Sequence, residues 1–397
     1  MKSEWTYRPL GELVSFASGG TPSKKRDDYW DGTIPWISAK TLKTENIDTS
    51  DLFITEEGLK AGSKIAPKGS ILLLTRGSGL FNGIPIARVE KDVAFNQDIK
   101  CLDSYGEVEN EFIFYWLLSQ KDYLMAKVGV TGIGAGKFDL DFLQKLMIPI
   151  PSERERKSIV GFASSISEKI RCNAKVNDNL QQQAQALFKS WFLNYEPWDG
   201  TAPNSWLHGK LGDYANIKRG GSPRPIQEYL SDSGLRWLKI SDVTGLQTPF
   251  IIDIKDHIIE EGLKKTVFLK AGSLVLSNSA TPGIPKILDV DSCIHDGWLY
   301  FPESRFSNEY LYLYFKYIRQ QLVNLSNGSV FNNLKTDILK GYPTILPDEE
   351  TLQRFDGIIK PMFLQMQNLT RESHDLMDLR DTILPRLMSG ELDVSGI

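Results

Sequence analysis

The two halves of this chain repeat one another over almost their whole length. Gly19-Gly20-Thr21-Pro22 returns as Gly220-Gly221-Ser222-Pro223, and Trp36 returns as Trp237 at the same spacing. Short loop insertions change the spacing further on, but the order of matching fragments is kept. A period this long is not that of a solenoid repeat. The pattern predicts a duplicated domain pair, and two similar modules in one chain suit a ligand that itself has two parts.

Composition is that of an ordinary globular protein. The chain has 397 residues, of which 41% are hydrophobic and 24% charged, which is enough for two or three domains with cores of their own. Residues 1–5 show no apolar signal region, and no apolar run approaches the roughly 20 residues that cross a bilayer. We therefore expect a cytoplasmic protein with no membrane partner.

Cysteine and histidine usage argues against disulfides and metal sites. Cys101, Cys172 and Cys293 lie far apart without pairing or ligand spacing, so reduced thiols are expected. The four histidines are scattered in the same way, and we predict no metal site.

The net charge of -4 weighs mildly against a nucleic-acid binder, because duplex binding usually draws on a basic surface. The acidity lies largely in residues 348–397, which leaves small basic clusters such as Lys24-Lys25-Arg26 elsewhere. Solvated surface loops are the alternative explanation for each cluster taken alone.

Each half has the same internal order of an α/β module followed by a long helix. Runs such as Ser70–Leu74 and Ser273–Leu276 are short apolar stretches preceded by glycine, as buried strands are. We predict modules at residues 1–151 and 194–347. Residues 152–193 and 348–397 are predicted to form long helices, the second with a carboxyl-terminal tail.

Both helical segments carry an apolar stripe with a heptad spacing, which predicts that the two helices pack on each other. About 40 residues at 1.5 Å rise make each helix roughly 60 Å long. The predicted seam of the first helix is Ile159, Ala163, Ile166, Ile170, Leu180, Ala184, Leu187 and Trp191, interrupted by Asn173 and Asn177. That of the second is Phe355, Ile359, Met362, Met366, Leu369, Leu376, Ile383 and Leu387, with Arg380 opposite Ala184 in the alignment. Pro361 and Pro385 predict a kinked start and an irregular end for the second helix.

Several fragments, in this order, resemble the specificity subunit of type I restriction-modification systems. They are Gly19–Pro22 followed by Ile34–Ser38, the Phe95-Asn96-Gln97 stretch, the helix end Leu187–Phe192, and Leu379–Leu392. The resemblance covers nearly the whole chain. The turns Asn96-Gln97-Asp98 and His295-Asp296-Gly297 depart from the Asn-Gln-Gly that the family more often shows.

The resemblance implies two target recognition domains in tandem, joined by two long helices that form an antiparallel coiled coil. Each domain would recognise one half of a split, asymmetric site in double-stranded DNA. The helices would carry two modification subunits, which methylate adenine with S-adenosylmethionine. Restriction subunits that use ATP and Mg would join the larger complex. The chain itself would hold no cofactor and perform no catalysis.

Motifs for such catalysis are missing from the chain. There is no Asn/Asp-Pro-Pro-aromatic loop to hold a flipped adenine. The glycine run Gly132–Lys137 lacks the spacing of a phosphate-binding loop, so a tight turn is the better interpretation.

Polar loop residues at matching places in the two modules are the candidates for contact with DNA, because Arg, Lys, Asn, Gln, Ser and Thr on rigid turns read base edges and phosphates. The first module offers Thr21, Ser23, Lys24, Lys25, Arg26, Lys40, Arg76, Ser78, Asn96 and Gln97. The second offers Arg219, Ser222, Arg224, Asp242, Ser277, Asn278, Ser279 and His295. Arg76 and Arg224 are the leading candidates, since arginine addresses guanine through two hydrogen bonds. A turn-capping or solvent-facing role is the alternative for each residue.

Two other classes of function stay open. In one, the chain is an assembly scaffold whose duplicated modules bind proteins instead of DNA. In the other, it is a methyltransferase with a divergent active site.

Overall fold

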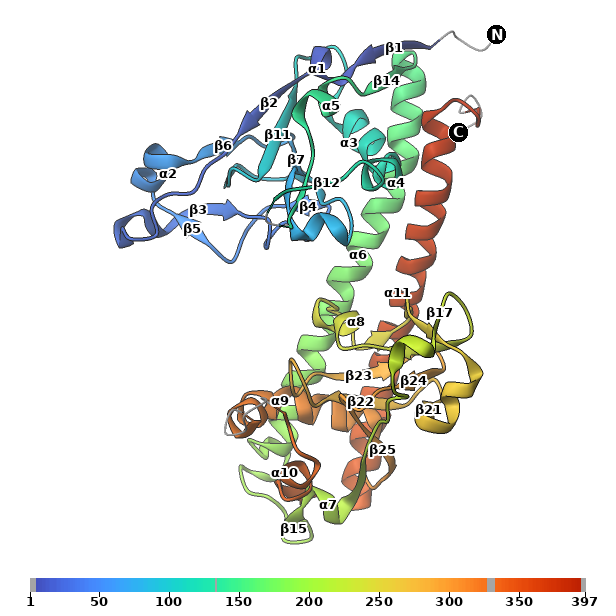
Figure 1. Cartoon of the computed structure of the whole chain (residues 1–397). Coiled ribbons are helices and arrows are strands. Elements are labelled where there is room, and N and C mark those ends of the chain that lie inside the picture. The colour runs from blue at the N-terminus through green and yellow to red at the C-terminus, as the bar shows by residue number, and fades with distance from the viewer. Residues whose placement is uncertain (1–4, 133, 327–332, 394–397) are drawn as a thin grey trace. The chain divides into compact units, whose positions relative to one another are not determined.

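The computed structural model describes residues 5–132, 134–326 and 333–393 (Figure 1). It divides into two compact units, one made of residues 1–168 and 376–397 and the other of residues 169–375. Each unit therefore contains part of both long helices. The division into four segments at 151, 193 and 347 stays a prediction. Residues 1–4, where no signal region is expected, lie outside the described residues. The same holds for Ile133 of the glycine run and for residues 394–397 of the carboxyl-terminal tail.

The first unit is built on a five-stranded sheet whose central strand, β7, is buried along its whole length. Gly69 at φ +89 precedes this strand, as expected for the turn that introduces it. The sheet runs β2 (Val14–Ser18), β11 (Ile99–Ser104), β7 (Ile71–Leu74), β9 (Ile86–Val89) and β4 (Asn46–Ile47). Neighbouring strands are antiparallel, except that β4 runs parallel to β9.

Smaller sheets and short helices complete this unit. A four-stranded sheet holds β5 (Phe53–Ile54), β3 (Trp30–Ile37), β10 (Val93–Phe95) and β6 (Lys64–Ala66). The other strands are β12 (Gly129–Val130), β13 (Gly136–Lys137) and β8 (Arg76–Gly77), and the pair β1 (Thr6–Pro9) and β14 (Met147–Ile150). The helices are α1 (Leu10–Leu13), α2 (Glu56–Gly62), α3 (Asn110–Ser119), α4 (Lys121–Met125) and α5 (Leu140–Gln144). Residues of α3 share one buried core with β7 and with Ile159 and Ala163 of the first long helix.

The second unit repeats this plan. Its main sheet has the matching order β16 (Ala215–Arg219), β25 (Trp298–Ser304), β22 (Leu274–Ser277), β23 (Pro285–Leu288) and β19 (Phe250–Ile251). A second sheet holds β17 (Leu230–Ser231), β20 (His257–Ile258), β18 (Leu235–Leu238), β24 (Ser292–Ile294) and β21 (Val267–Leu269). The remaining elements are the strand pair β15 (Leu207–Lys210) and β26 (Pro343–Leu346), and the helices α7 (Leu211–Tyr214), α8 (Ser241–Thr244), α9 (Asn308–Ser326) and α10 (Thr336–Lys340). The tandem α/β fold predicted from the repeat is confirmed.

Two helices of 40 residues each, α6 (Glu153–Phe192) and α11 (Glu349–Met388), match the predicted long helices. A capping box starts α6, because Glu155 Oε2 accepts from the backbone N–H of Ser152 at 2.9 Å and Glu155 N–H donates to Ser152 Oγ at 3.4 Å. Asp348 caps α11 by accepting from the N–H of Thr351 at 2.9 Å.

Within the second unit the two helices run antiparallel. Asn173 Nδ2 donates to Glu372 Oε2 at 2.8 Å, whereas Asn177, one turn later, donates to Thr370, which comes earlier in α11. Rings of Phe192 and Phe355 meet at 4.7 Å between centroids. Within the first unit, Arg380 of α11 donates to the hydroxyl of Ser167 of α6 at 3.3 Å.

Burial along the predicted seam is uneven. Of the predicted positions, the structure buries Ile159, Ala163, Ile166, Asn173, Asn177, Ala184, Phe355, Ile359, Met366 and Leu387. It leaves half-buried Ile170, Leu180, Leu187, Trp191, Met362, Leu369, Leu376 and Ile383. The neighbours Phe188, Phe192, Phe363 and Leu384 are buried as well. Other elements of each unit cover the helices from another side, as α9 does where the ring of Tyr310 lies 5.2 Å from that of Phe188, so burial follows a broader stripe than a two-helix heptad describes.

The expected irregular end of α11 is wrong, because the helix continues through both prolines to Met388. Proline leaves the carbonyl four residues earlier without its helical partner. The residues that lose this partner, Gly357 and Asp381, are exposed. Water can therefore hydrogen-bond the freed carbonyls. No helix among the described residues is both long and apolar enough to span a membrane.

Candidate nucleic-acid interface

The glycine-rich loop after the first strand of each main sheet packs directly on the backbone at the end of a neighbouring strand, β10 or β24, which pairs with the strand of Trp36 or Trp237. A Cβ on Gly19 would lie 2.0 Å from the carbonyl oxygen of Phe95. A Cβ on Gly220 would lie 2.2 Å from that of His295. Only glycine fits so close to a carbonyl, which explains why both copies keep it.

The residue two positions after each of these glycines ties the loop to the facing turn. In the first unit the hydroxyl of Thr21 donates to Oε1 of Gln97 at 2.7 Å. In the second unit the hydroxyl of Ser222 donates to Oδ1 of Asp296, also at 2.7 Å. The duplication has thus kept one contact while changing the chemistry of the acceptor from an amide to a carboxylate.

A cavity of about 260 Å³ in the first unit brings together Arg76 and Gln97 with two lysines that sequence reasoning missed, Lys100 and Lys137. Asp139 also lines it. Within the described part of the chain, none of the three cations forms an ion pair, although Lys100 donates to the hydroxyl of Ser18. The cavity therefore presents positive charge beside the amide of Gln97, a combination that suits an anionic ligand with hydrogen-bonding edges.

The other candidates of the first unit lie apart from this cavity or are bonded within their own loop. Ser23, Lys24, Lys25, Lys40 and Ser78 are exposed. Arg26 is also exposed and pairs with Asp28 at 2.7 Å. Asn96 is buried. Its Nδ2 donates to Oδ2 of Asp98, and its Oδ1 accepts from the backbone N–H of Asp98, both at 3.2 Å. The contacts of Asn96 are those of a turn cap.

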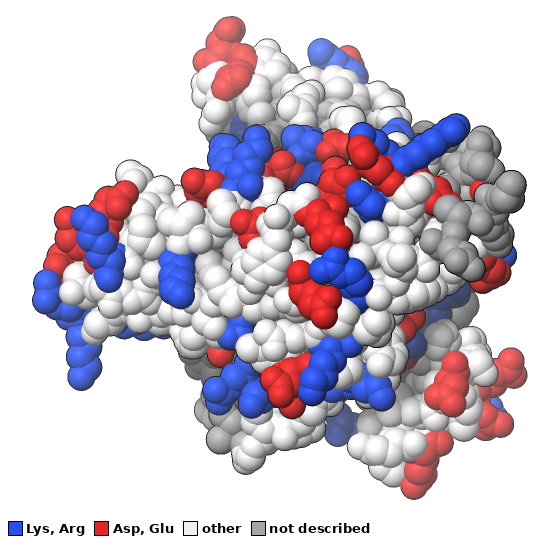
Figure 2. Space-filling view, turned by 90° about the horizontal axis from the view of Figure 1, so that it is seen from above, with Lys and Arg blue, Asp and Glu red and all other residues white. Residues whose placement is uncertain are grey.

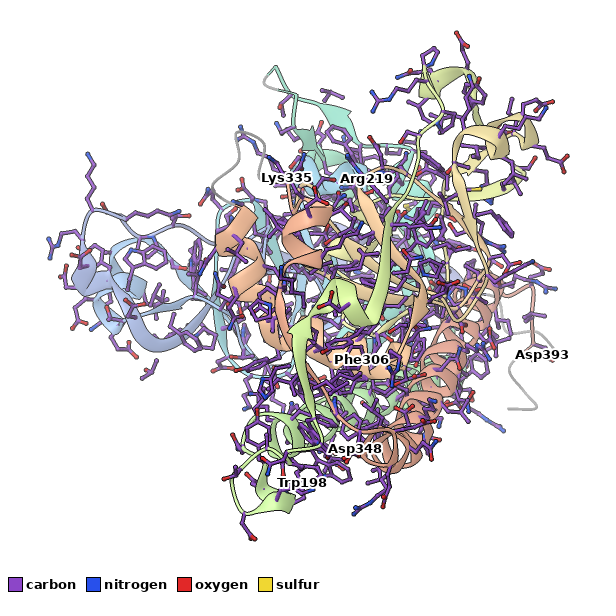
Figure 3. The ribbon with its side chains drawn as sticks, turned by 90° about the horizontal axis from the view of Figure 1, so that it is seen from below. Trp198, Arg219, Phe306, Lys335, Asp348 and Asp393 are labelled. Carbon is purple, nitrogen blue, oxygen red and sulfur yellow. The ribbon has the colours of Figure 1, made fainter. Side chains whose placement is uncertain are left out.

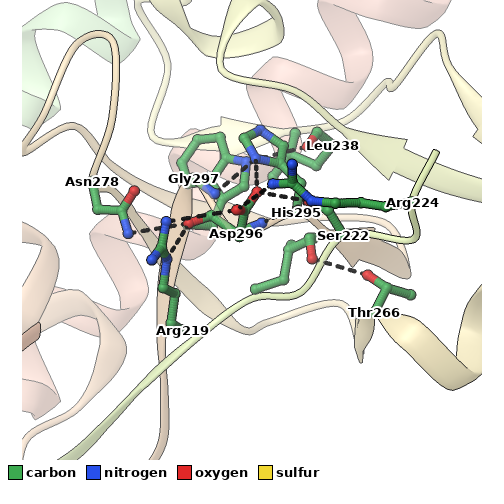
Figure 4. A network of polar contacts seen from close by, with 11 residues as sticks. Arg219, Ser222, Arg224, Leu238, Thr266, Asn278, His295, Asp296 and Gly297 are labelled. Atoms are coloured by element: carbon green, nitrogen blue, oxygen red, sulfur yellow. Dashed lines mark hydrogen bonds and ion pairs between the residues drawn. The ribbon is translucent and has the colours of Figure 1, made fainter. Parts of the chain in front are cut away.

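In the second unit an acidic residue joins several predicted residues into one network (Figure 4). The carboxylate of Asp296 accepts hydrogen bonds from the hydroxyl of Ser222 and from Nη2 of Arg224, the latter at 3.1 Å. Its backbone carbonyl accepts from Nε of Arg219 and from Nδ2 of Asn278. Burial alone would raise the pKa of Asp296, but the Ser222 hydroxyl and the two arginines outweigh it and lower the pKa. The carboxylate therefore stays charged at neutral pH.

His295 lies beside this network, with its ring 5.9 Å from that of Trp237. Its Nδ1 accepts from the N–H of Gly297 at 2.8 Å. Burial lowers the pKa of His295 despite the neighbouring Asp296, so the imidazole is neutral at pH 7. The contacts of His295 thus shape the turn that carries Asp296.

The remaining candidates of the second unit make local contacts. Ser277 is fully buried and donates to the carbonyl of Thr281 at 2.6 Å. Asp242 accepts from the N–H of Lys239 at 2.8 Å, and burial raises its pKa. Ser279 is half-buried. Arg219 lies at the end of β16, where the chain leaves the main sheet (Figure 3).

These arrangements can recognise a ligand, and we find no group of metal-binding side chains among the described residues. Lys and Arg are interspersed with Asp and Glu on the face drawn in Figure 2. With a net charge of -4 as well, the chain as a whole does not attract an anionic polymer, so local loop chemistry has to supply the affinity.

Comparisons with known proteins agree with this architecture. The family model described as type I restriction modification DNA specificity domain matches residues 2–182 and 203–367. The MjaIX specificity subunit of Methanocaldococcus jannaschii is 25% identical to this chain over 99% of the chain and 95% of its own length. The EcoR124I/EcoR124II specificity subunit of Escherichia coli is 31% identical over 40% of each chain. The crystal structure of an S subunit from M. genitalium superposes with a TM-score of 0.56 at 18% identity, covering 97% of this chain and 96% of the other.

Proposed function

This chain belongs to the specificity subunits of type I restriction-modification systems, and we propose that each of its two units recognises one half of a split, asymmetric DNA site. The observation that carries the proposal is the matched pair of contacts, Thr21 to Gln97 and Ser222 to Asp296. The same scaffold holds a different polar group at the same place in each unit. Two related readers with different chemistry suit a target whose halves differ in sequence.

Affinity and base choice would come from different residues. Exposed lysines such as Lys24 and Lys25 are suited to phosphates, which position a protein on DNA without reading its sequence. Gln97, Arg76 and Arg224 carry the planar amide and guanidinium groups that pair with base edges.

The proposal includes the partners that the family implies. Two modification subunits would methylate adenine with S-adenosylmethionine, and restriction subunits would use ATP and Mg. The long helices would carry the modification subunits and set the distance between the half-sites. The chain itself would contribute recognition alone, with no cofactor and no catalytic group.

Selection from a duplex library with a randomised core, using the chain together with a modification subunit, tests the proposal. We expect a consensus of two separated blocks. Recovery of sequences without any shared block would instead favour a scaffold whose modules bind proteins. Methyl transfer by the chain alone would point to a divergent methyltransferase.

A further inference from the structure

Three matching positions at the ends of strands or in the adjoining turns differ in charge between the two units. Ser18, Ser23 and Gln97 of the first unit correspond to Arg219, Arg224 and Asp296 of the second. The strand pairing supports the first match, because Ser18 pairs with Lys100 in β2 and β11, as Arg219 pairs with Leu299 in β16 and β25. The second unit thus has one acid and two arginines at places where the first is uncharged.

The structure brings these three residues into contact. Nη2 of Arg224 lies 3.1 Å from Oδ2 of Asp296, and Nη2 of Arg219 lies 3.7 Å from the same oxygen. Arg219 is also held by the bond from its Nε to the Asp296 carbonyl. The side chains of Arg219 and Arg224 are nevertheless 51% and 77% exposed. Arg224 is therefore anchored through one nitrogen and Arg219 through two, and both side chains remain largely exposed to solvent.

An anchored arginine is a suitable reader of guanine. Guanine presents two acceptors, O6 and N7, in the major groove, and the guanidinium donates to both with two parallel N–H bonds. Anchoring reduces the side-chain freedom that binding would otherwise remove. A carboxylate facing DNA alone would be repelled by phosphates. Between two arginines it leaves the cluster with a net positive charge.

We propose that Asp296 is a positioning residue that holds Arg219 and Arg224 as guanine readers for the half-site of the second unit. This inference rests on the proposed function. Ser18, Gln97 and Ser23 cannot form the same cluster in the first unit. Guanine recognition through this cluster is therefore specific to one half of the target.

The test uses the full-length chain and a duplex library with a randomised core. Arg219→Lys and Arg224→Lys keep the charge but lose the planar fork. For each, we expect the preference for guanine at one position of one block to fall by about 5- to 150-fold, the range that corresponds to one bidentate contact. The other block should not change. Asp296→Asn still accepts a hydrogen bond from Ser222. It should weaken the same guanine preferences, and the affinity for a non-specific duplex should not fall.

The salt dependence of binding distinguishes recognition of a base from contact with a phosphate. Arg219→Ser should relax the guanine preference and leave the salt slope of binding nearly unchanged, because that slope reports the number of phosphate contacts; a slope that falls by about 1 with the guanine preference intact would make Arg219 a phosphate contact and overturn the inference. Lys210→Ser, which removes an exposed charge from β15 of the same unit, is the matched control and should leave every base preference unchanged. Thermal melting of each variant shows that it is folded, and the lysine variants retain the charge that pairs with Asp296.

The outcomes distinguish two failures. If the wild-type chain selects no consensus, the proposed function fails together with this inference. If the wild-type chain selects two blocks, but both lysine variants keep all base preferences or the affected block contains no guanine, the inference alone is overturned.

Discussion

Arg380 and Glu45 form a double hydrogen bond inside the first unit, with Nη1 and Nη2 of the arginine 2.6 and 2.9 Å from the two carboxylate oxygens. The Arg380 side chain is only 3% exposed, and that of Glu45 is 29% exposed. Lys121 also reaches Glu45, at 3.0 Å. The pair joins α11 to the loop before β4 and so fixes the last part of that helix on its recognition unit.

Removing the carboxylate should destabilise the first unit. Among the described residues, Glu45→Ala leaves the buried guanidinium of Arg380 with Asp381 as its one acid partner, at 2.8 Å. We expect a loss of about 3 kcal/mol, near the lower end for breaking a buried pair because Glu45 is partly exposed. Hydrogen exchange of peptides from α3 and β7 measures it. Asp28→Ala, which removes the partner of Arg26 in an exposed pair, is the control and should leave this exchange unchanged. Equal behaviour of the two variants would contradict the prediction.

The contribution of Glu45 should also depend on pH. Burial acts to raise the pKa of Glu45, but Lys121 and Arg380 outweigh it, so the folded pKa lies below the ordinary value of 4.5. A carboxyl with a lowered folded pKa stabilises the protein above its unfolded pKa, and this stabilisation is lost as the pH falls through the folded pKa. The difference in unfolding free energy between the wild type and Glu45→Gln should therefore be constant near neutral pH and shrink below pH 4.5. Urea unfolding across that range checks it, and a difference that grows on acidification would refute it.

Two buried asparagines of α6 should respond oppositely to replacement by leucine. Nδ2 of Asn177 donates to Oγ1 of Thr370 at 3.2 Å. Its Oδ1 is buried and accepts no hydrogen bond from any described group. Asn177→Leu removes this unpaired acceptor, and Thr370 still donates to the carbonyl of Met366 at 2.7 Å. We expect the second unit to gain about 1 kcal/mol.

Asn173→Leu is the matched control. Asn173 is 1% exposed and donates to both Glu372 and Ser373, at 2.8 and 3.2 Å. Its replacement should cost about 1–2 kcal/mol, because a bond to a charged acceptor is lost. Thermal melting of both variants gives the sign of each change, and a loss of stability in Asn177→Leu would contradict the prediction.

The fold could be predicted largely from the sequence. The repeat shows two similar modules, and the apolar periodicity of each 40-residue helical segment can be seen without knowing which distant residues it contacts. The candidate site could be predicted only in part. Lys100 and Lys137 reach the cavity of Arg76 and Gln97 through strand pairings that join distant segments, as in Lys137 opposite Arg76. For Lys100, the one signal in the local sequence is the alternation of buried and outward-facing side chains in the strand that follows the turn at Gln97. The role of Asp296 depends on Arg219 and Arg224, which the tertiary fold brings to it from a segment more than 70 residues earlier.

Arginine at position 380 shows the same limit from the other side. The heptad pattern marks it as a break in an apolar stripe, and the adjacent Asp381 is the acid partner that the nearby sequence offers. Glu45, which the nearby sequence does not indicate, adds a second acid partner from 335 residues earlier. Long-range ion pairs of this kind follow from the tertiary fold and not from periodicity.

The two loop glycines provide a last prediction, because each should affect one half of the DNA site. A Cβ on Gly19 would press on the Phe95 carbonyl at 2.0 Å, so Gly19→Ala must displace the loop that carries Thr21 away from Gln97. The variant should lose about 1–3 kcal/mol of stability, the usual cost of overpacking. It should also lose base preference in one block of the selected DNA. Gly220→Ala should weaken the other block, through Ser222 and Asp296. Gly161→Ala is the control, because a Cβ there meets nothing within 4 Å and alanine favours the helix by up to about 1 kcal/mol. It should raise the melting temperature and leave both blocks intact, whereas loss of the same block in both loop variants would disprove the assignment of one unit to each half-site.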